Sequence, residues 1–416
     1  MKPEITEIIG GYLFEWTEVA LTAKASRIHV HQDGHISGML QITHNNGSKP
    51  IRLLPTSQFN FSSELTRTKQ ANSLKRKVPN LEIEWLDIFD GLGEFIQERE
   101  LSGTPSIATD TETEYSAPPL LIDPLIYKGH QNIIFGEKGV NKSTIAYALA
   151  LFLASPEWDN PLEMTVDSKP LTTMVLDWET DQRTFGWYLN RLKRGLGCPS
   201  ATFYYRHCRL PLAQDIELIA DDIATKGVEL LIIDSLGAAA GGESGELKGS
   251  QSAIQFNSAL RNLPGVTTLI LAQTAKGGEG QKSIFGSVYF QYYSRNIFEL
   301  SVAQENEPGS LNLALFHRDC NFAERHKPIG IRVVYEKNSI SLNRRSVDLT
   351  EFVGKIKETT AILELLKSGA KDISQIKKAT GFKEDTIRKS LSRLKKRGEV
   401  INLSTGMWGL QSKDVL

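Results

Sequence analysis

A nine-residue segment, Gly136-Glu137-Lys138-Gly139-Val140-Asn141-Lys142-Ser143-Thr144, constrains the fold more than any other part of the sequence. An apolar run from Asn132 to Phe135 precedes the segment, and a longer apolar run from Ile145 to Ala154 follows it. A strand, a glycine-bearing loop and a helix in this order are typical of a loop whose backbone N–H groups surround phosphate at a helix N-terminus. The segment therefore predicts a binding site for the phosphates of a nucleotide.

One position departs from the usual pattern of such loops, G-x-x-x-x-G-K-[ST], because Asn141 stands where the second glycine is expected. Asparagine tolerates a positive φ angle better than most residues, so the loop can keep its shape. Lys142 is expected to reach the β- and γ-phosphates of ATP, and the Ser143 hydroxyl is expected to hold Mg²⁺. A loop that binds nucleotide but supports little turnover remains an alternative.

A second apolar run, from Thr172 onward, ends in acidic residues. Its last residue, Glu179, is expected at the carboxyl end of a strand, where open α/β sheets place their chemistry. A carboxylate there can orient and deprotonate the water that attacks the γ-phosphate. Asp177 is the competing candidate for this role.

Two further apolar runs also end in polar residues. Asp234 directly follows the run that starts at Glu229 and is predicted to help hold Mg²⁺. Gln273 ends the run that starts at Thr267 and is able to hydrogen-bond the γ-phosphate. Two later cations, Lys276 and Arg295, are candidates for reaching the nucleotide of a neighbouring subunit.

These segments together resemble the RecA-like ATPase core, and within it the branch of the plasmid replicative helicase RepA and related phage and mobile-element ATPases. The resemblance covers roughly residues 120–345 and includes Phe285-Gly286-Ser287. It implies an α/β fold with a mainly parallel sheet, and it implies ATP and Mg²⁺ as ligands. It further implies hydrolysis at subunit interfaces and a homo-oligomer on DNA, expected as a hexameric ring.

The resemblance also implies a role for each candidate residue. Lys142 binds phosphate, Ser143 and Asp234 hold Mg²⁺, Glu179 is the general base, Gln273 is the phosphate sensor, and Arg295 is the arginine finger in trans. The family usually carries His at the position of Gln273 and Gly at that of Asn141. Both departures bear on the rate of hydrolysis more than on the fold.

The C-terminal segment differs in charge from the rest of the chain. From Glu351 onward it carries 14 Lys and Arg and 8 Asp and Glu, about +6, whereas the whole chain carries −1. Such asymmetry indicates an anionic partner. Three helical patterns and a hairpin pattern within residues 346–416 resemble a winged helix-turn-helix domain, with a protein-contact module as the alternative. The side chains expected to contact DNA are Lys383, Thr386, Lys389 and Arg393.

The remaining segments are assigned by composition and pattern. Residues 102–119 are rich in Ser, Thr, Pro and acids, which predicts a linker before an ATPase domain at residues 120–345. Residues 1–101 are expected to form an α+β module of unknown role, which binds either single-stranded DNA or a partner protein of replication or of a mobile element. No apolar run approaches a membrane span, and three cysteines without zinc spacing indicate reduced thiols. A cytoplasmic protein without membrane contact is expected.

The sequence as a whole predicts an Mg-ATP-dependent motor acting on DNA, either a ring-forming helicase or a DNA-remodelling ATPase of a mobile element or phage replication system. One alternative is an ATP-gated DNA-binding adaptor or replication regulator with slow or no hydrolysis. Another is a recombinase-type filament ATPase, which shares the core and differs in its assembly. The preferred DNA structure, the direction of movement and the number of subunits are left open.

Overall fold

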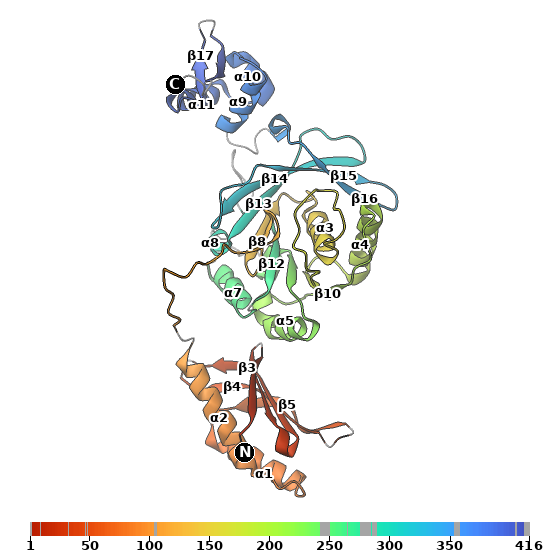
Figure 1. Cartoon of the computed structure of the whole chain (residues 1–416), viewed down its shortest axis with the longest axis vertical. Coiled ribbons are helices and arrows are strands. Elements are labelled where there is room, and N and C mark those ends of the chain that lie inside the picture. The colour runs from red at the N-terminus through yellow and green to blue at the C-terminus, as the bar shows by residue number, and fades with distance from the viewer. Residues whose placement is uncertain are drawn as a thin grey trace. The chain divides into compact units, whose positions relative to one another are not determined.

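The computed structural model describes residues 2–411, apart from positions 9, 32, 46, 48, 104–105, 242–249, 264, 275–283, 285–288, 353–357 and 404–405. Lys276 and the Phe285-Gly286-Ser287 segment therefore lie outside the described residues. The chain forms two compact units (Figure 1). One unit consists of Met1–Ser116, Asp215–Thr225 and Leu260–Pro264, and the other of Ala117–Gln214, Lys226–Ala259 and Gly265–Leu416.

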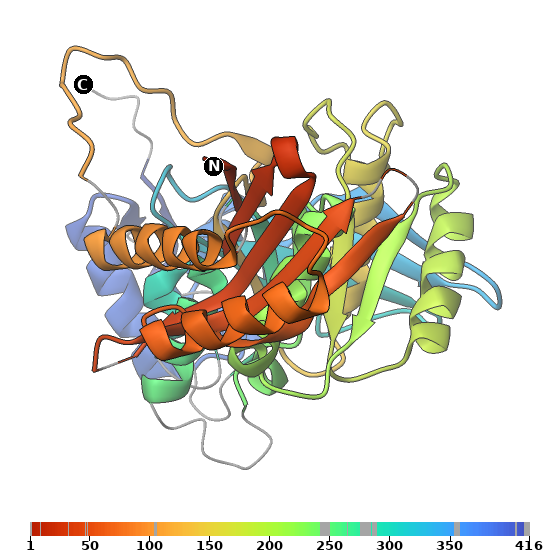
Figure 2. The same cartoon turned by 90° about the horizontal axis from the view of Figure 1, so that it is seen from below.

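The N-terminal residues form an antiparallel sheet of five strands in chain order. These strands are β1 (Glu4–Ile8), β2 (Gly11–Trp16), β3 (Leu21–Val30), β4 (Ile36–Asn45) and β5 (Pro50–Asn60). Helices α1 (Glu64–Lys77) and α2 (Trp85–Ser102) follow, and Figure 2 shows both lying across one face of the sheet. Alternate side chains of β2 and β4 are buried, and they share one core with Trp85 and Phe89 of α2. This part of the chain is an α+β fold with a core of its own.

The second unit is built on a nine-stranded sheet with the order β10-β9-β11-β12-β8-β13-β14-β15-β16. The strands are β8 (Gln131–Gly136), β9 (Thr173–Asp177), β10 (Phe203–His207), β11 (Leu230–Asp234), β12 (Thr267–Gln273), β13 (Asn296–Val302), β14 (Ser310–Cys320), β15 (Ile329–Tyr335) and β16 (Ile340–Arg345). The six strands from β10 to β13 in this order pair in parallel, and β14 to β16 continue the sheet as antiparallel hairpins. The predicted α/β core with a mainly parallel sheet is confirmed.

Two segments within residues 117–293, Asp215–Thr225 and Leu260–Pro264, belong to the first unit. The elements of this range outside the nine-stranded sheet are mostly helical. They are the short strands β6 (Leu120–Ile122) and β7 (Ile126–Tyr127), and helices α3 (Lys142–Ala154), α4 (Gln182–Leu196), α5 (Leu212–Lys226), α6 (Leu236–Ala239), α7 (Ser250–Arg261) and α8 (Tyr289–Tyr293). Every residue of β9 and β11 is buried, which explains why both read as continuous apolar runs. Residues 144–153 of α3 are buried as well, and they form one core with α4 and the central strands.

The C-terminal segment has three helices followed by a two-stranded hairpin. The elements are α9 (Glu358–Lys367), α10 (Ile373–Thr380), α11 (Glu384–Lys396), β17 (Val400–Asn402) and β18 (Trp408–Leu410). Asp372 caps α10 by accepting a hydrogen bond from the backbone N–H of Gln375, whose side chain accepts one from the N–H of Asp372 in return. Gly381 ends the helix in the left-handed conformation. An apolar core of its own, including Ile376, Leu391 and Val400, holds these elements together.

Among the described residues, no helix combines the length and the apolar character that crossing a membrane requires.

Candidate nucleotide-binding site

The carboxyl ends of four parallel strands meet at one edge of the central sheet. In the strand registers Asp177 lies opposite Asp234, and Gly136 lies opposite Gln273. A cavity of about 390 Å³ opens at this edge. Its lining includes nine of the residues singled out in the sequence, which are Lys138, Gly139, Asn141, Lys142, Ser143, Thr144, Glu179, Asp234 and Gln273. The rest of the lining comes from Tyr147, Thr180, Thr184, Phe185, Trp187, Tyr188 and Ser235.

The loop between β8 and α3 has the backbone conformation that its sequence predicts. Gly139 and Asn141 both have positive φ angles, 81° and 68°. Asn141 is therefore in the left-handed region, where glycine is usual and asparagine is tolerated. A Cβ atom on Gly136 would lie 2.5 Å from the Leu300 carbonyl oxygen, so only glycine fits there. The helix begins at Lys142, and the N–H groups of its first turn are available to an anion.

The Lys142 side chain lies against the loop that carries it. Its Nζ donates hydrogen bonds to the carbonyl oxygens of Gly136 (3.1 Å) and Glu137 (2.8 Å). Burial lowers the pKa of Lys142, while the nearby carboxylates of Asp234 and Glu179 act in the opposite direction. The cation is thus placed inside the cavity together with both acids.

Ser143 and Asp234 are in direct contact. The Ser143 hydroxyl donates a hydrogen bond of 2.5 Å to Oδ2 of Asp234, and the Tyr147 hydroxyl donates a longer one of 3.3 Å to the same oxygen. The pKa of the Asp234 carboxyl is raised to about 6, mainly by burial. The charges of Glu179 and Asp177 contribute to the rise, and the hydroxyl donors Ser143 and Tyr147 oppose it. A buried carboxylate beside a hydroxyl is a donor set of hard oxygen ligands. These two residues therefore fit Mg²⁺, as the sequence predicts.

The two acids at the end of β9 differ in what they contact. Asp177 is 1% exposed, and its Oδ1 accepts hydrogen bonds from the N–H groups of Glu179 (2.8 Å) and Thr180 (3.0 Å). Its Oδ2 accepts from the hydroxyls of Thr180 and Tyr205. Glu179 is exposed and lines the cavity, with Oε1 accepting a 2.7 Å hydrogen bond from the Ser235 hydroxyl. Asp177 shapes the turn, and Glu179 is the carboxylate that water can reach.

Arg295 lies at the opposite end of the parallel strands, where they begin. It directly precedes β13, and its N–H donates to the carbonyl oxygen of Gln131 at the start of β8. From Gln131 to Gly136, where the phosphate loop begins, β8 has six residues and spans roughly 17 Å. The structure therefore does not bring Arg295 to the cavity of its own chain, whereas Gln273 does line that cavity. A role for Arg295 in a neighbouring subunit stays a prediction.

Several tyrosines at the cavity were not anticipated from the sequence. Tyr147 is one helical turn beyond Ser143, and this i, i+4 spacing is a signal that a helix prediction could have used. Tyr188 comes from α4, and its hydroxyl lies 3.0 Å from Oγ1 of Thr144. Tyr335, at the end of β15, donates a hydrogen bond to Oδ1 of Asn141. The separation of Asn141 and Tyr335 in the chain leaves no local signal for this contact.

The central part of the chain is similar to a known protein family and to solved structures. Residues 97–279 match the family model of the AAA domain. A KaiC-like protein from the hyperthermophilic archaeon Pyrococcus horikoshii is similar in structure, with 17% identity and a TM-score of 0.37 over 53% of this chain and 93% of that one. The flagellar accessory protein FlaH from Methanocaldococcus jannaschii is similar with 15% identity and a TM-score of 0.36, over 53% of this chain and 92% of that one. No curated protein matches the sequence. The family match, the mainly parallel sheet and the phosphate loop support a RecA-like P-loop core in this part of the chain.

Proposed function

We propose that the protein is an Mg-ATP-dependent motor that acts on DNA, a ring-forming helicase or DNA-remodelling ATPase of a mobile element or phage replication system. The observation that carries the enzymatic half of the proposal is the placement of four groups in one cavity. These are the Lys142 ammonium, the Ser143–Asp234 pair and the Glu179 carboxylate. Charge, metal ligands and a base at one edge of a sheet are the groups that phosphoryl transfer to water needs.

The cavity also offers separate places for the two ends of ATP. Its polar side, formed by the loop and the acids, suits the triphosphate and Mg²⁺, held by Ser143 and Asp234. Its other side is aromatic and comes from α4, where Trp187 is 55% exposed. The Arg191 guanidinium lies 4.8 Å from the centre of the Trp187 ring and holds the indole in place. The exposed indole is suited to stack on the adenine base.

In this proposal hydrolysis uses Glu179 as the general base. Its carboxylate would accept a proton from the attacking water while the bond between the γ-phosphorus and the leaving ADP oxygen breaks. The Ser235 hydroxyl holds Oε1 of Glu179, so the second oxygen is left for water. Gln273 would contact the γ-phosphate, and Arg295 would reach the nucleotide of the next subunit in a homo-oligomer, which we propose is a hexameric ring.

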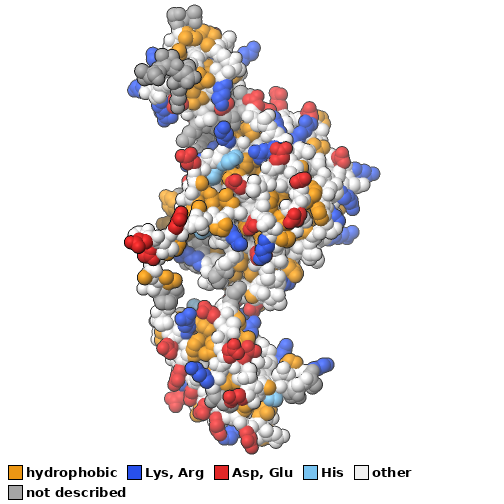
Figure 3. All heavy atoms as spheres, in the orientation of Figure 1, with side chains coloured by type: hydrophobic (Ala, Val, Ile, Leu, Met, Phe, Trp, Pro, Cys, Tyr) orange, Lys and Arg blue, Asp and Glu red, His pale blue; other side chains and the backbone are white. Residues whose placement is uncertain are grey.

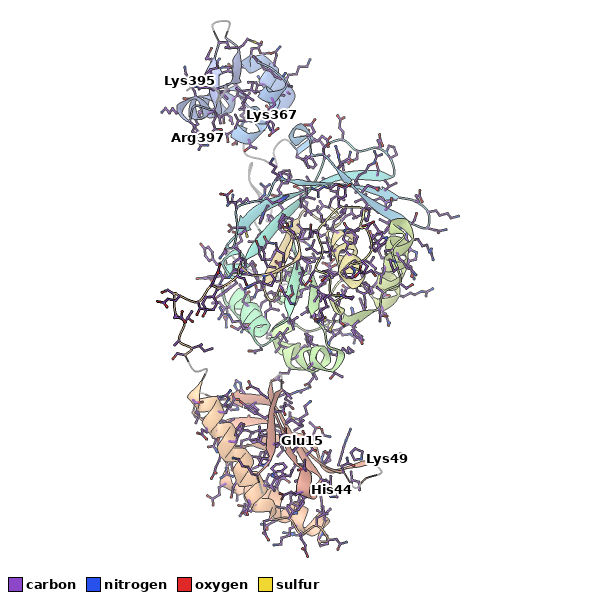
Figure 4. All side chains as sticks on the ribbon, viewed as in Figure 1. Glu15, His44, Lys49, Lys367, Lys395 and Arg397 are labelled. Atoms are coloured by element: carbon purple, nitrogen blue, oxygen red, sulfur yellow. The ribbon has the colours of Figure 1, made fainter. Side chains whose placement is uncertain are left out.

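The DNA-binding half of the proposal rests on α11. Ile387, Leu391 and Leu394 face the core, whereas Lys383, Lys389 and Arg393 are exposed and Thr386 is half-buried. Within the described part of the chain, Lys383, Lys389 and Arg393 form no ion pair, which leaves their charge for phosphate. Figure 3 shows further Lys and Arg side chains on the surface of this segment, and Lys367, Lys395 and Arg397 are labelled on it in Figure 4. Three helices and a hairpin with a basic third helix support the winged helix-turn-helix assignment of this proposal.

The test of the enzymatic half is steady-state ATP hydrolysis, with and without single-stranded and duplex DNA, with Glu179→Gln as the blank. Turnover that DNA stimulates, and that is absent from the variant, is the expected result. Strand separation is then the next assay. ATP binding without turnover above that of the Glu179→Gln variant would refute the proposal of a motor.

The test of the DNA half is the affinity for duplex DNA as a function of salt. Removing two phosphate contacts with Lys389→Ala and Arg393→Ala together should reduce the salt slope by about 2. Lys367→Ala is the matched control, because this exposed lysine of α9 already pairs with Glu364 at 2.6 Å. An unchanged slope in the double variant would make the segment a protein-contact module.

One observation favours a second function, an ATP-gated DNA-binding adaptor with slow hydrolysis. Asn141 replaces the second glycine of the loop and its side chain is held by Tyr335, which restricts the motion of the loop. A recombinase-type filament shares the same core and would differ in its assembly. In each case the N-terminal module would hold single-stranded DNA or a replication or mobile-element partner, in the cytoplasm and away from membranes.

A further inference from the structure

Among the described residues, the contacts of the Asn141 side chain lie on its carboxamide oxygen. Its Oδ1 accepts hydrogen bonds from the hydroxyls of Tyr335 and Thr144, the latter at 3.2 Å. The Thr144 hydroxyl also contacts the Tyr188 hydroxyl at 3.0 Å. The structure thus places the carboxamide oxygen against the hydroxyls of Tyr335 and Thr144.

The other half of the carboxamide is available to a ligand. Within the described part of the chain, Nδ2 of Asn141 has no hydrogen-bond partner. Asn141 lines the cavity and directly precedes Lys142, the first residue of α3. With Oδ1 held by Tyr335 and Thr144, the two N–H bonds of Nδ2 are directed away from those hydroxyls.

Tyr335 is itself held in place. It is the last residue of β15, and the turn that follows is fixed to α4 because Arg191 donates hydrogen bonds to the carbonyl oxygens of Glu336 (2.6 Å) and Ser339 (3.4 Å). Burial is the main cause that raises the pKa of Tyr335, so its hydroxyl keeps its proton and remains a donor at physiological pH. The hydroxyl that orients Asn141 therefore belongs to a fixed part of the sheet.

We propose that Asn141 is a phosphate-binding residue whose carboxamide NH₂ donates to the nucleotide, and that Tyr335 is the positioning residue that orients it. This inference rests on the proposed ATP site and assigns two residues of that site. Asparagine at the usual glycine position then adds a side-chain donor that glycine lacks, while its φ of 68° preserves the loop. The departure from the motif becomes a specific gain in phosphate contact.

The test measures binding, so that hydrolysis does not enter. Dissociation constants for a non-hydrolysable ATP analogue and for inorganic tripolyphosphate are determined by calorimetry for wild type, Asn141→Gly and Asn141→Asp. Asn141→Gly should raise the dissociation constants of both ligands by the same factor, about 10- to 150-fold. This factor corresponds to the free energy of one hydrogen bond to a charged group. Asn141→Asp keeps the acceptor for Tyr335 and replaces the donor by a negative charge, so its loss should be larger.

The role of Tyr335 is tested by a double-mutant cycle. Tyr335→Phe should weaken the binding of tripolyphosphate several-fold in the wild-type background. In the Asn141→Gly background, it should cause no further loss of affinity. Tyr204→Phe, on β10, is the matched control and should leave both ligands unaffected. A purely structural role would instead lower the melting temperature and weaken binding equally in both backgrounds.

Two outcomes would overturn the inference. One is an Asn141→Gly protein that binds tripolyphosphate as tightly as wild type, and the other is a Tyr335→Phe loss of the same size in both backgrounds. Failure of the nucleotide site itself would look different, because Lys142→Ala would then bind tripolyphosphate as well as wild type does.

Discussion

Replacing Asp234 by asparagine should stabilise the nucleotide-free protein at neutral pH. Burial raises the pKa of this carboxyl to about 6 in the folded protein, whereas in the unfolded chain it is about 4. Below pH 4 the carboxyl is neutral in both states and costs nothing. Between pH 4 and 6 the unfolded chain ionises first, so the folded protein loses stability, and above pH 6 the full cost is present.

The magnitude follows from the two pKa values. A difference of about two pH units corresponds to about 3 kcal/mol of unfolding free energy above pH 6. For a domain of this size, that shifts the melting temperature by roughly 6–12 °C. Asparagine has nearly the shape of aspartate and is neutral at every pH, so Asp234→Asn should avoid the cost.

The assay is differential scanning calorimetry without Mg²⁺ at pH 4.5, 6 and 7.5, following the transition that ATP shifts. The variant should melt close to wild type at the lowest pH and above it at pH 7.5. Asp159→Asn, at an exposed carboxylate, is the control and should match wild type throughout. If Asp234→Asn melts at or below wild type at pH 7.5, the electrostatic reasoning is wrong. When Mg²⁺ and ATP are added, the melting temperature of wild type should rise, whereas that of Asp234→Asn should change little.

Three further predictions concern the cavity and its neighbours. Glu179→Gln should bind ATP normally and lose about 10²- to 10⁴-fold in turnover, as measured by single-turnover hydrolysis, and full turnover would place the base elsewhere. Trp187→Ala should weaken the binding of the ATP analogue by about 5- to 150-fold, which corresponds to the free energy of one stacked base, and should leave tripolyphosphate binding unchanged. An equal loss for both ligands would remove the base-stacking role. Arg295→Ala, titrated into wild type, should reduce activity more steeply than simple dilution does, and a linear decrease would count against a finger in trans.

The parts of the candidate site that depend on the order of residues along the chain could be predicted from the sequence. Glu179, Asp234 and Gln273 each follow an apolar run, and parallel strands bring such ends together at one edge. Two features could not be predicted from the local sequence. The tyrosines that surround Asn141 come from α4 and β15, and only the folded chain shows that they meet. Helix α1 is so polar that only Ala71 and Leu74 are buried, so its apolar pattern was too sparse to predict a helix, even though Ser63 caps it.

The position of Arg295, at the end of the sheet opposite the phosphate loop, has a consequence for how activity would depend on protein concentration. Arg295 lies a full strand length from the phosphate loop of its own chain and does not line that cavity. If that arginine acts on a neighbour, specific activity obeys mass action: it rises with the concentration of assembled subunits and vanishes on dilution below the dissociation constant of the assembly. A cell could then switch the enzyme by changing its local abundance, without any effector.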